Sequence, residues 1–155
     1  MHNPARAAES RRGRLTEGVR RRPHIGEMQD PWNPSADDVR TWARSPDPVE
    51  PCEDWDLALS WARHDPAYLE LAADDACHAR RYLLRVLYLI VGDAVRTGYR
   101  TAGRGDIEAL LVRADAYAHP DIRLWQRRSR DLLAGRVAFD YDSWCAGGLA
   151  SRPDA

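Results

Sequence analysis

Residues 76–97 read ACHARRYLLRVLYLIVGDAVRT, and this stretch decides the fold. Its middle, residues 82–91, is apolar or aromatic except for Arg85. The run is too short to span a bilayer, and its apolar residues are too continuous for a helix that turns one side to water. We therefore expect residues 76–97 to form a buried central helix around which the chain packs. Its deepest residues are predicted to be Val86, Leu87 and Ile90.

Helix start and stop signals divide the flanking sequence into shorter helices. Ser35 has Asp38 at the capping-box distance, and His119-Pro120 places a proline where a helix can begin. Asp74 or Asp75 is expected to cap the central helix, and Gly135 follows the end of a helix. The predicted helices cover residues 36–43, 52–63, 65–73, 76–97, 106–114, 119–133 and 140–149.

No segment alternates apolar and polar residues over a useful length, so no sheet is expected. The predicted fold class is therefore all-α, a compact bundle of about six or seven helices around a central apolar helix, with a disordered N-terminal tail. Residues 28–155 are long enough to form one domain with its own core, without disulfides or metals.

Residues 1–27 differ in composition from the rest of the chain. They hold seven arginines against three glutamates, a net charge of +4, and their few large apolar residues are Leu15, Val19 and Ile25. Such a segment buries too little apolar surface to offset the entropy of ordering, so we expect a disordered basic tail. Met28 follows directly, which leaves open that translation starts there and that the tail is mis-assigned.

The basic residues and the cysteines indicate the compartment. All 23 basic residues are arginine, which biased codon usage explains more simply than nucleic-acid binding, where lysine normally accompanies arginine. The three cysteines are widely spaced, and the first residues lack the apolar core of a secretory signal. We expect reduced thiols, a cytoplasmic protein and no membrane segment.

No catalytic or cofactor motif stands out. The sequence has no glycine-rich phosphate loop after a strand, no serine nucleophile elbow and no two-histidine metal motif. We therefore predict no catalytic residue, no cofactor and no metal. A cysteine–histidine site assembled only in three dimensions stays open as an alternative, in which Cys52, Cys77 and Cys145 would meet histidines such as His64, His78 or His119.

Six tryptophans are an unusual number for a chain of this length. Four lie on apolar helical stripes and are expected to pack in the core: Trp42, Trp55, Trp125 and Trp144. Trp32 lies in an irregular segment between prolines, and Trp61 lies off the main stripe of its helix. Core packing is the commoner fate of tryptophan and is our expectation for both. If they are exposed instead, they suit a binding site for a partner protein.

Charge is distributed unevenly along the chain. Residues 30–75 contain twelve acidic residues against three arginines, a net charge of −9, whereas residues 76–155 carry +4. One interpretation is that these acids cap helices and solvate the surface, with capping assigned to Asp54, Asp65, Asp74 and Asp75. The other is an acidic face that attracts a basic partner, formed by Asp37, Asp38, Glu50, Glu53 and Asp56.

The functional hypothesis from the sequence is a non-enzymatic protein-binding module with an acidic, tryptophan-bearing face for a basic protein. An antidote to a basic nuclease-like toxin and an adaptor are two versions of it. The predicted partner-binding residues are Trp32, Asp37, Asp38, Glu50, Glu53, Asp56 and Trp61. One alternative is a nucleic-acid-associated protein that uses the arginine-rich tail and the helix at residues 120–133, although the net charge of −1 argues against it. The sequence does not indicate an oligomeric state.

Overall fold

The computed structural model describes residues 28–147, so the predicted basic tail and residues 148–155 lie outside the described part. Seven α-helices and one 3-10 turn make up the ordered elements, and residues 28–147 contain no strand, which confirms the all-α prediction. The elements are α1 (Ala36–Ala43), α2 (Trp55–Ala62), α3 (Asp65–Ala72), α4 (Arg80–Arg96), α5 (Arg104–Arg113), η1 (Ala114–Ala116), α6 (Pro120–Leu133) and α7 (Tyr141–Ala146).

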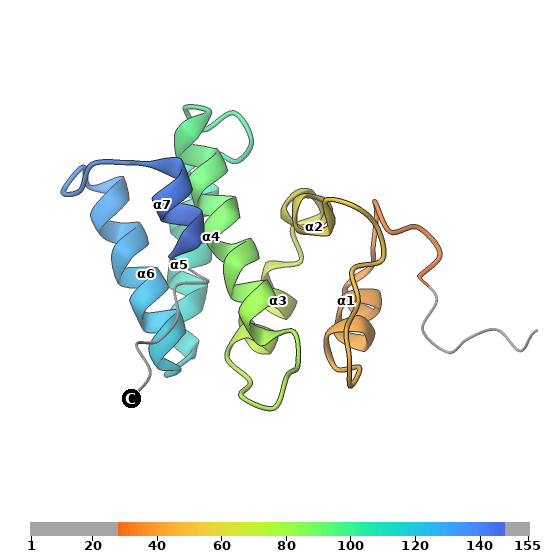
Figure 1. Cartoon of the computed structure of the whole chain (residues 1–155). Helices are drawn as coiled ribbons and strands as arrows, with labels where there is room; N and C mark the ends of the chain where they lie inside the picture. The colour runs from red at the N-terminus through yellow and green to blue at the C-terminus, as the bar shows by residue number, and fades with distance from the viewer. Residues whose placement is uncertain (1–27, 148–155) are drawn as a thin grey trace, which may run out of the picture.

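Helix α4 is the centre of the bundle. It packs against α2, α3, α5, α6 and α7. Figure 1 shows α1, α2 and α3 on one side of it and α6 and α7 on the other. Val86 and Leu87 are fully buried and Ile90 nearly so, as predicted. Among the described residues, no helix combines the length and apolar character needed to cross a bilayer.

The start of α4 differs from the prediction. The helix begins at Arg80, after Ala79, and no side chain caps it. Residues 74–79 instead form turns that dock on the end of α1, where the Ala79 amide donates to the Ala43 carbonyl at 3.2 Å. Asp74 accepts from the amide of Ala76 at 2.9 Å, and Asp75 lies 3.0 Å from a nitrogen of His119. Neither residue therefore caps α4, although Asp75 also lies 3.8 Å from the guanidinium of Arg80, the first residue of that helix.

Helix α2 begins later than predicted, at Trp55, because Asp54 has a left-handed backbone with φ of 56°. The Asp54 side chain makes no capping hydrogen bond. Asp65 is the first residue of α3 rather than its cap, and its carboxylate accepts two hydrogen bonds from Arg63, at 2.9 and 2.7 Å. Capping was therefore the wrong explanation for Asp54 and Asp65.

Other predicted helix ends are confirmed. Ser35 and Asp38 form the capping box of α1, the His119 side chain accepts from the Asp121 amide at the start of α6, and Asp140 caps α7. Helix α7 ends at Ala146, whereas the prediction extended it to residue 149, outside the described part.

The core tryptophans lie as predicted. Trp55 and Trp125 are fully buried and Trp144 is nearly so. Trp42 is half-buried and packs edge-on against the rings of Trp55 and Tyr82, with centroids 5.5 and 5.3 Å away. Large aromatic side chains at the helix contacts bury much of the apolar surface that stabilises this small bundle.

Candidate protein-binding site

Trp32 and Trp61 form an aromatic pair on the surface. Trp32 belongs to the segment before α1, and Trp61 lies in the last turn of α2. Their ring centroids are 6.2 Å apart, yet 47% of Trp32 and 62% of Trp61 remain exposed. Core packing was therefore the wrong expectation for both residues, because α2 turns Trp55 and Leu59 inward and Trp61 to solvent.

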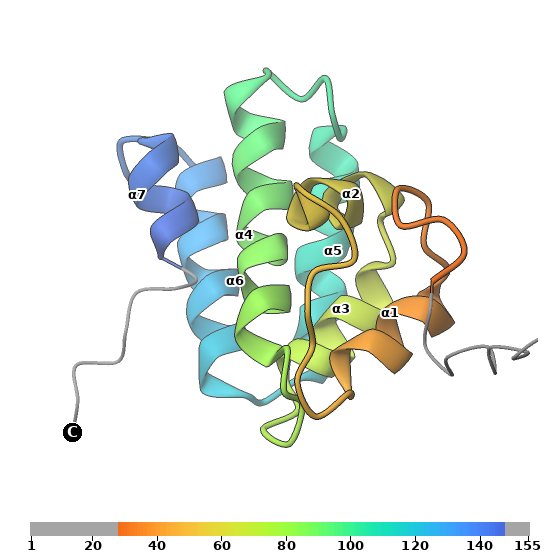
Figure 2. The same cartoon turned by 45° about the vertical axis from the view of Figure 1, so that its right-hand side comes forward.

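Hydrogen bonds fix the loop that carries Trp32. The Trp32 amide donates to the Asp30 carboxylate at 3.1 Å, and the amide of Asn33 donates to the Asp30 carbonyl, also at 3.1 Å. Nε2 of His64 lies 2.7 Å from the carbonyl oxygen of Pro34, which is buried. Figure 2 shows this loop beside α2. The pair is thus held before any partner arrives, which lowers the entropy cost of binding.

Three carboxylates lie near enough to the half-buried thiol of Cys52 to affect its pKa. Burial raises the pKa of this thiol, and the nearby charges of Glu50, Asp54 and Asp30 raise it further. Asp30 also contacts Trp32, so it joins the carboxylates to the aromatic pair. Sequence reasoning missed Asp30 and mistook Asp54 for a cap. The available signal was the position of Asp30 in the same irregular, proline-flanked segment as Trp32.

The predicted acidic residues of α1 are already engaged within that helix. Asp37 is 95% exposed at its side chain but lies 3.3 Å from the guanidinium of Arg40. The Asp38 carboxylate accepts from the Ser35 amide at 2.9 Å, as the capping box requires. These two carboxylates lie on α1, whereas those around Cys52 belong to the segments that precede α1 and α2.

The other three predicted acids lie around the start of α2. Glu50 and Glu53 are exposed. Asp56 is largely buried and lies 3.4 Å from the guanidinium of Arg85 on α4. Burial, followed by the charges of Asp56 and Glu50, raises the pKa of Tyr82, which places both carboxylates near that side chain. Asp56 therefore joins α2 to α4, whereas Glu50 and Glu53 are available to a partner.

The arginines of α6 form less of a basic face than the sequence suggests. Arg123 and Arg130 lie 3.8 and 3.3 Å from the carboxylate of Asp115. Arg128 stacks on two aromatic rings. Arg127 is exposed and, within residues 28–147, has no ion-pair partner. Most of the positive charge of this helix is engaged in contacts within the fold.

The cysteines and histidines do not come together in the described residues. Cys52, Cys77 and Cys145 are free thiols, and burial is the main cause that raises the pKa of each. His64 contacts a backbone carbonyl and His119 a carboxylate of a surface turn. Within residues 28–147 no group of three or more histidine, cysteine or acidic side chains is arranged to hold a metal ion. A nucleophilic thiol needs a lowered pKa, which none of these environments supplies.

Comparison with known proteins does not add a functional assignment. No protein-family model matches the chain, and no match is found among the curated proteins or the solved structures. The interpretation of this site therefore rests on the exposed aromatic pair and on the carboxylates around Cys52, of which Asp30 contacts Trp32.

Proposed function

We propose that the chain is a non-enzymatic protein-binding module that holds a basic segment of a partner protein. The binding surface, called the Trp–acid face, consists of Asp30, Trp32, Glu50, Glu53, Asp54 and Trp61. The observation that carries the proposal is the exposed Trp32–Trp61 pair, with ring centroids 6.2 Å apart.

The tryptophan pair suits the recognition of arginine or lysine. The face of an indole ring carries negative electrostatic potential and attracts a guanidinium or ammonium group, and tryptophan is the best of the side chains for this contact. Tryptophan is also enriched among residues that dominate binding energy at protein interfaces. Two such rings side by side offer a partner a wide apolar surface together with two cation-binding faces.

The carboxylates around Cys52, which Asp30 links to the pair, favour a basic partner. Residues 30–75 carry a net charge of −9. The Asp54 side chain caps no helix, and within residues 28–147 it has no ion-pair partner, so its charge is available. Complementary charge steers a partner toward the surface and speeds association. The partner class is therefore a protein with an exposed arginine- or lysine-rich segment. An antidote to a basic nuclease-like toxin and an adaptor both fit this class.

Binding of a labelled arginine-rich peptide, measured by fluorescence anisotropy, tests the proposal. Trp32→Ala and Trp61→Ala should each weaken binding by about tenfold, since each removes one cation–π contact and part of the apolar surface. Val112→Ala is the matched control, because Val112 is exposed on α5, far along the chain from the Trp–acid face. A glutamate-rich peptide of equal length should not bind.

The same assay separates the nucleic-acid alternative. If a DNA or RNA oligonucleotide bound tightly, and if neither tryptophan variant changed that affinity, the arginine-rich segments would be the functional part of the chain. If both tryptophan variants bound the basic peptide as tightly as the wild-type protein does, the proposed Trp–acid face would be wrong.

A further inference from the structure

A cavity of about 120 Å³ adjoins the Trp–acid face, because Trp61 belongs to both. Its lining includes Ser60 and Trp61 from α2, Asp93 from α4, and Thr101 and Ala102 from the loop that follows α4. A cavity needs about 10–15 Å³ to hold one water molecule, so this one has room for a small chemical group.

Asp93 supplies a carboxylate to the cavity wall although the residue is only 7% exposed. Its Oδ1 atom accepts from the Tyr141 hydroxyl at 3.0 Å and from Nε and Nη2 of Arg96 at 3.3 and 3.2 Å. Within residues 28–147 its Oδ2 atom accepts no hydrogen bond, yet this atom retains some accessible surface. Oδ2 is therefore the oxygen to which a ligand in the cavity can donate.

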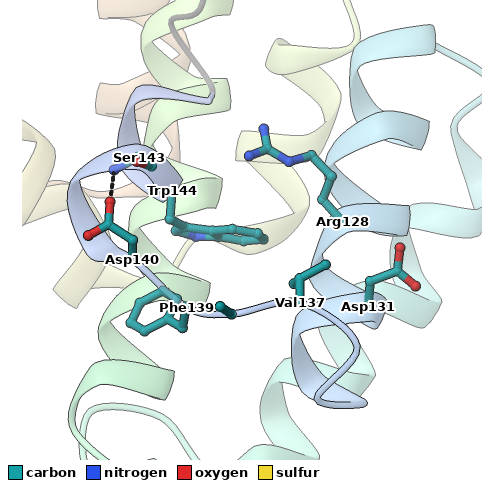
Figure 3. Close-up of a pocket in the computed structure, with 8 residues that line it drawn as sticks. Arg128, Asp131, Val137, Phe139, Asp140, Ser143 and Trp144 are labelled. Atoms are coloured by element: carbon teal, nitrogen blue, oxygen red, sulfur yellow. Dashed lines mark hydrogen bonds between the residues drawn. The ribbon is translucent and has the colours of Figure 1, made fainter.

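Helix α7 fixes the orientation of the Asp93 carboxylate before a ligand binds. Tyr141 is the first residue of α7, and the Trp144 ring of the same helix lies between Arg128 on one face and Phe139 on the other (Figure 3). The Arg128 guanidinium carbon is 5.3 Å from the centroid of that ring, and the Phe139 centroid is 6.5 Å from it. Because these contacts anchor α7, the Tyr141 hydroxyl is held against Oδ1, and binding at Oδ2 requires little reordering.

The charges of the cavity wall favour a cation over an anion. Arg63 also lines the cavity, but its guanidinium donates two hydrogen bonds to the Asp65 carboxylate, at 2.9 and 2.7 Å. The charge of Arg63 is therefore offset by a close partner. Arg96, the ion-pair partner of Asp93, is 54% exposed at its side chain, so solvent screens its contribution. The Asp93 charge is thus the less compensated of the two.

The oxygen atoms of the wall match an ammonium group. The Ser60 hydroxyl donates to the Leu57 carbonyl at 2.8 Å, so it is left to act as an acceptor, and the Thr101 hydroxyl can accept as well. A lysine ammonium is compact and has three donors and no acceptor, whereas the planar guanidinium of arginine has five donors and needs more space. The apolar part of the wall, which includes Ile90 and Ala102, suits the methylene chain of lysine.

We propose that this cavity receives the side chain of a lysine from the partner protein, with the ammonium group at Oδ2 of Asp93 and the methylene chain against Trp61. The inference rests on the proposed function, because the lysine belongs to the basic segment that the Trp–acid face holds. It narrows the partner class from a basic segment in general to one with an accessible lysine.

Fluorescence anisotropy with labelled hexalysine and hexa-arginine peptides tests the assignment. Asp93→Asn should weaken hexalysine binding by about tenfold, and this loss should be at least about threefold larger than the loss for hexa-arginine, which does not use the cavity. Asp142→Asn is the matched control, because it removes the same charge from an exposed residue of α7 that does not line the cavity, and it should not distinguish the peptides. A smaller difference between the peptides with Asp93→Asn would overturn the proposal.

A second variant separates the cavity from the packing of α7, since Asp93 also bonds Tyr141. Ala102→Leu keeps Asp93 and adds three carbon atoms to the cavity wall, and it should also weaken hexalysine binding at least about threefold more than hexa-arginine binding. If Ala102→Leu kept the wild-type ratio of the two affinities, the proposed location would be wrong.

Trp32→Ala distinguishes failure of this inference from failure of the proposed function, because Trp32 belongs to the Trp–acid face but does not line the cavity. Under both proposals Trp32→Ala weakens the binding of the two peptides by similar factors. If it does so while Asp93→Asn fails to distinguish them, the lysine cavity alone is wrong. If neither peptide binds the wild-type protein, the proposed function is wrong as well.

Discussion

The indole nitrogen of Trp144 donates a hydrogen bond to the backbone carbonyl of Tyr88 at 2.8 Å, and this bond ties α7 to the central helix. Helix α7 has six residues and is too short to be stable alone, so its position depends on such contacts. Trp125 offers a contrast, since it is fully buried but its indole nitrogen has no partner among the described residues.

This contrast predicts that replacement by phenylalanine lowers the free energy of unfolding by different amounts at Trp144 and Trp125. Trp144→Phe and Trp125→Phe both shorten a buried aromatic side chain, but only the first loses a hydrogen bond. We expect Trp144→Phe to lower the free energy of unfolding by about 1 kcal/mol more than Trp125→Phe does. Urea denaturation followed by circular dichroism measures both. Equal losses would mean that the Trp144–Tyr88 bond contributes nothing to stability.

Two glycine-to-alanine substitutions should have opposite effects. Gly92 lies inside α4, and a Cβ there would come within 2.7 Å of the Trp144 ring, so Gly92→Ala should destabilise by about 1–3 kcal/mol although alanine favours helices. Gly105, in the first turn of α5, has open space around it, and Gly105→Ala should stabilise by about 0.5–1 kcal/mol. Thermal unfolding of both variants checks the signs. A stabilised Gly92→Ala variant would show that Trp144 moves aside readily.

The features that could be predicted from the sequence depend on neighbours along the chain. The apolar run at 82–91 and the capping box at Ser35 and Asp38 are local signals, and the structure confirms both. The contact between Trp32 and Trp61 and the ion pair between Asp56 and Arg85 each join residues about 30 positions apart. Periodicity carries no information about such contacts. Helix-capping rules also gave a wrong assignment where a carboxylate binds another side chain, as Asp65 binds Arg63.

Burial of Leu87 at the centre of α4 predicts a large effect of truncation. Leu87→Ala should lower the free energy of unfolding by about 2–5 kcal/mol, through lost apolar burial and the cavity left behind. Val112→Ala removes apolar atoms at a site that is 64% exposed and should change stability by under about 0.5 kcal/mol. The urea midpoint of each variant gives the comparison. A wild-type midpoint for Leu87→Ala would contradict a core built around α4.

Residues 1–27 are predicted to be dispensable for folding, because their composition offers few apolar side chains for docking. A variant that starts at Met28 should have a melting temperature within about 2 °C of that of the full chain. Calorimetric scans of the two proteins at the same concentration check this. A fall of about 8 °C or more would show that the basic segment packs on the bundle.

Substitutions of the carboxylates around α2 distinguish those that stabilise the fold from those that are available to a partner. Asp56 contacts Arg85 at 3.4 Å, so Asp56→Asn leaves a partly exposed arginine without its carboxylate and should cost about 0.5–1 kcal/mol of stability. Glu50 and Glu53 are exposed, and within residues 28–147 neither forms an ion pair. Reversing both to arginine should therefore change stability by less than about 0.5 kcal/mol.

The effect of the Glu50→Arg/Glu53→Arg double variant on binding decides between the functional hypotheses. If the Trp–acid face steers a basic partner, the variant should associate with an arginine-rich peptide more slowly, and the difference from wild type should shrink as salt rises past about 0.15 M. Stopped-flow association at several salt concentrations measures this. Under the nucleic-acid alternative the sign is opposite: added arginines should strengthen binding to DNA or RNA, and wild-type affinity for the oligonucleotide should fall steeply with salt. An unchanged association rate at low salt would show that these carboxylates only solvate the surface.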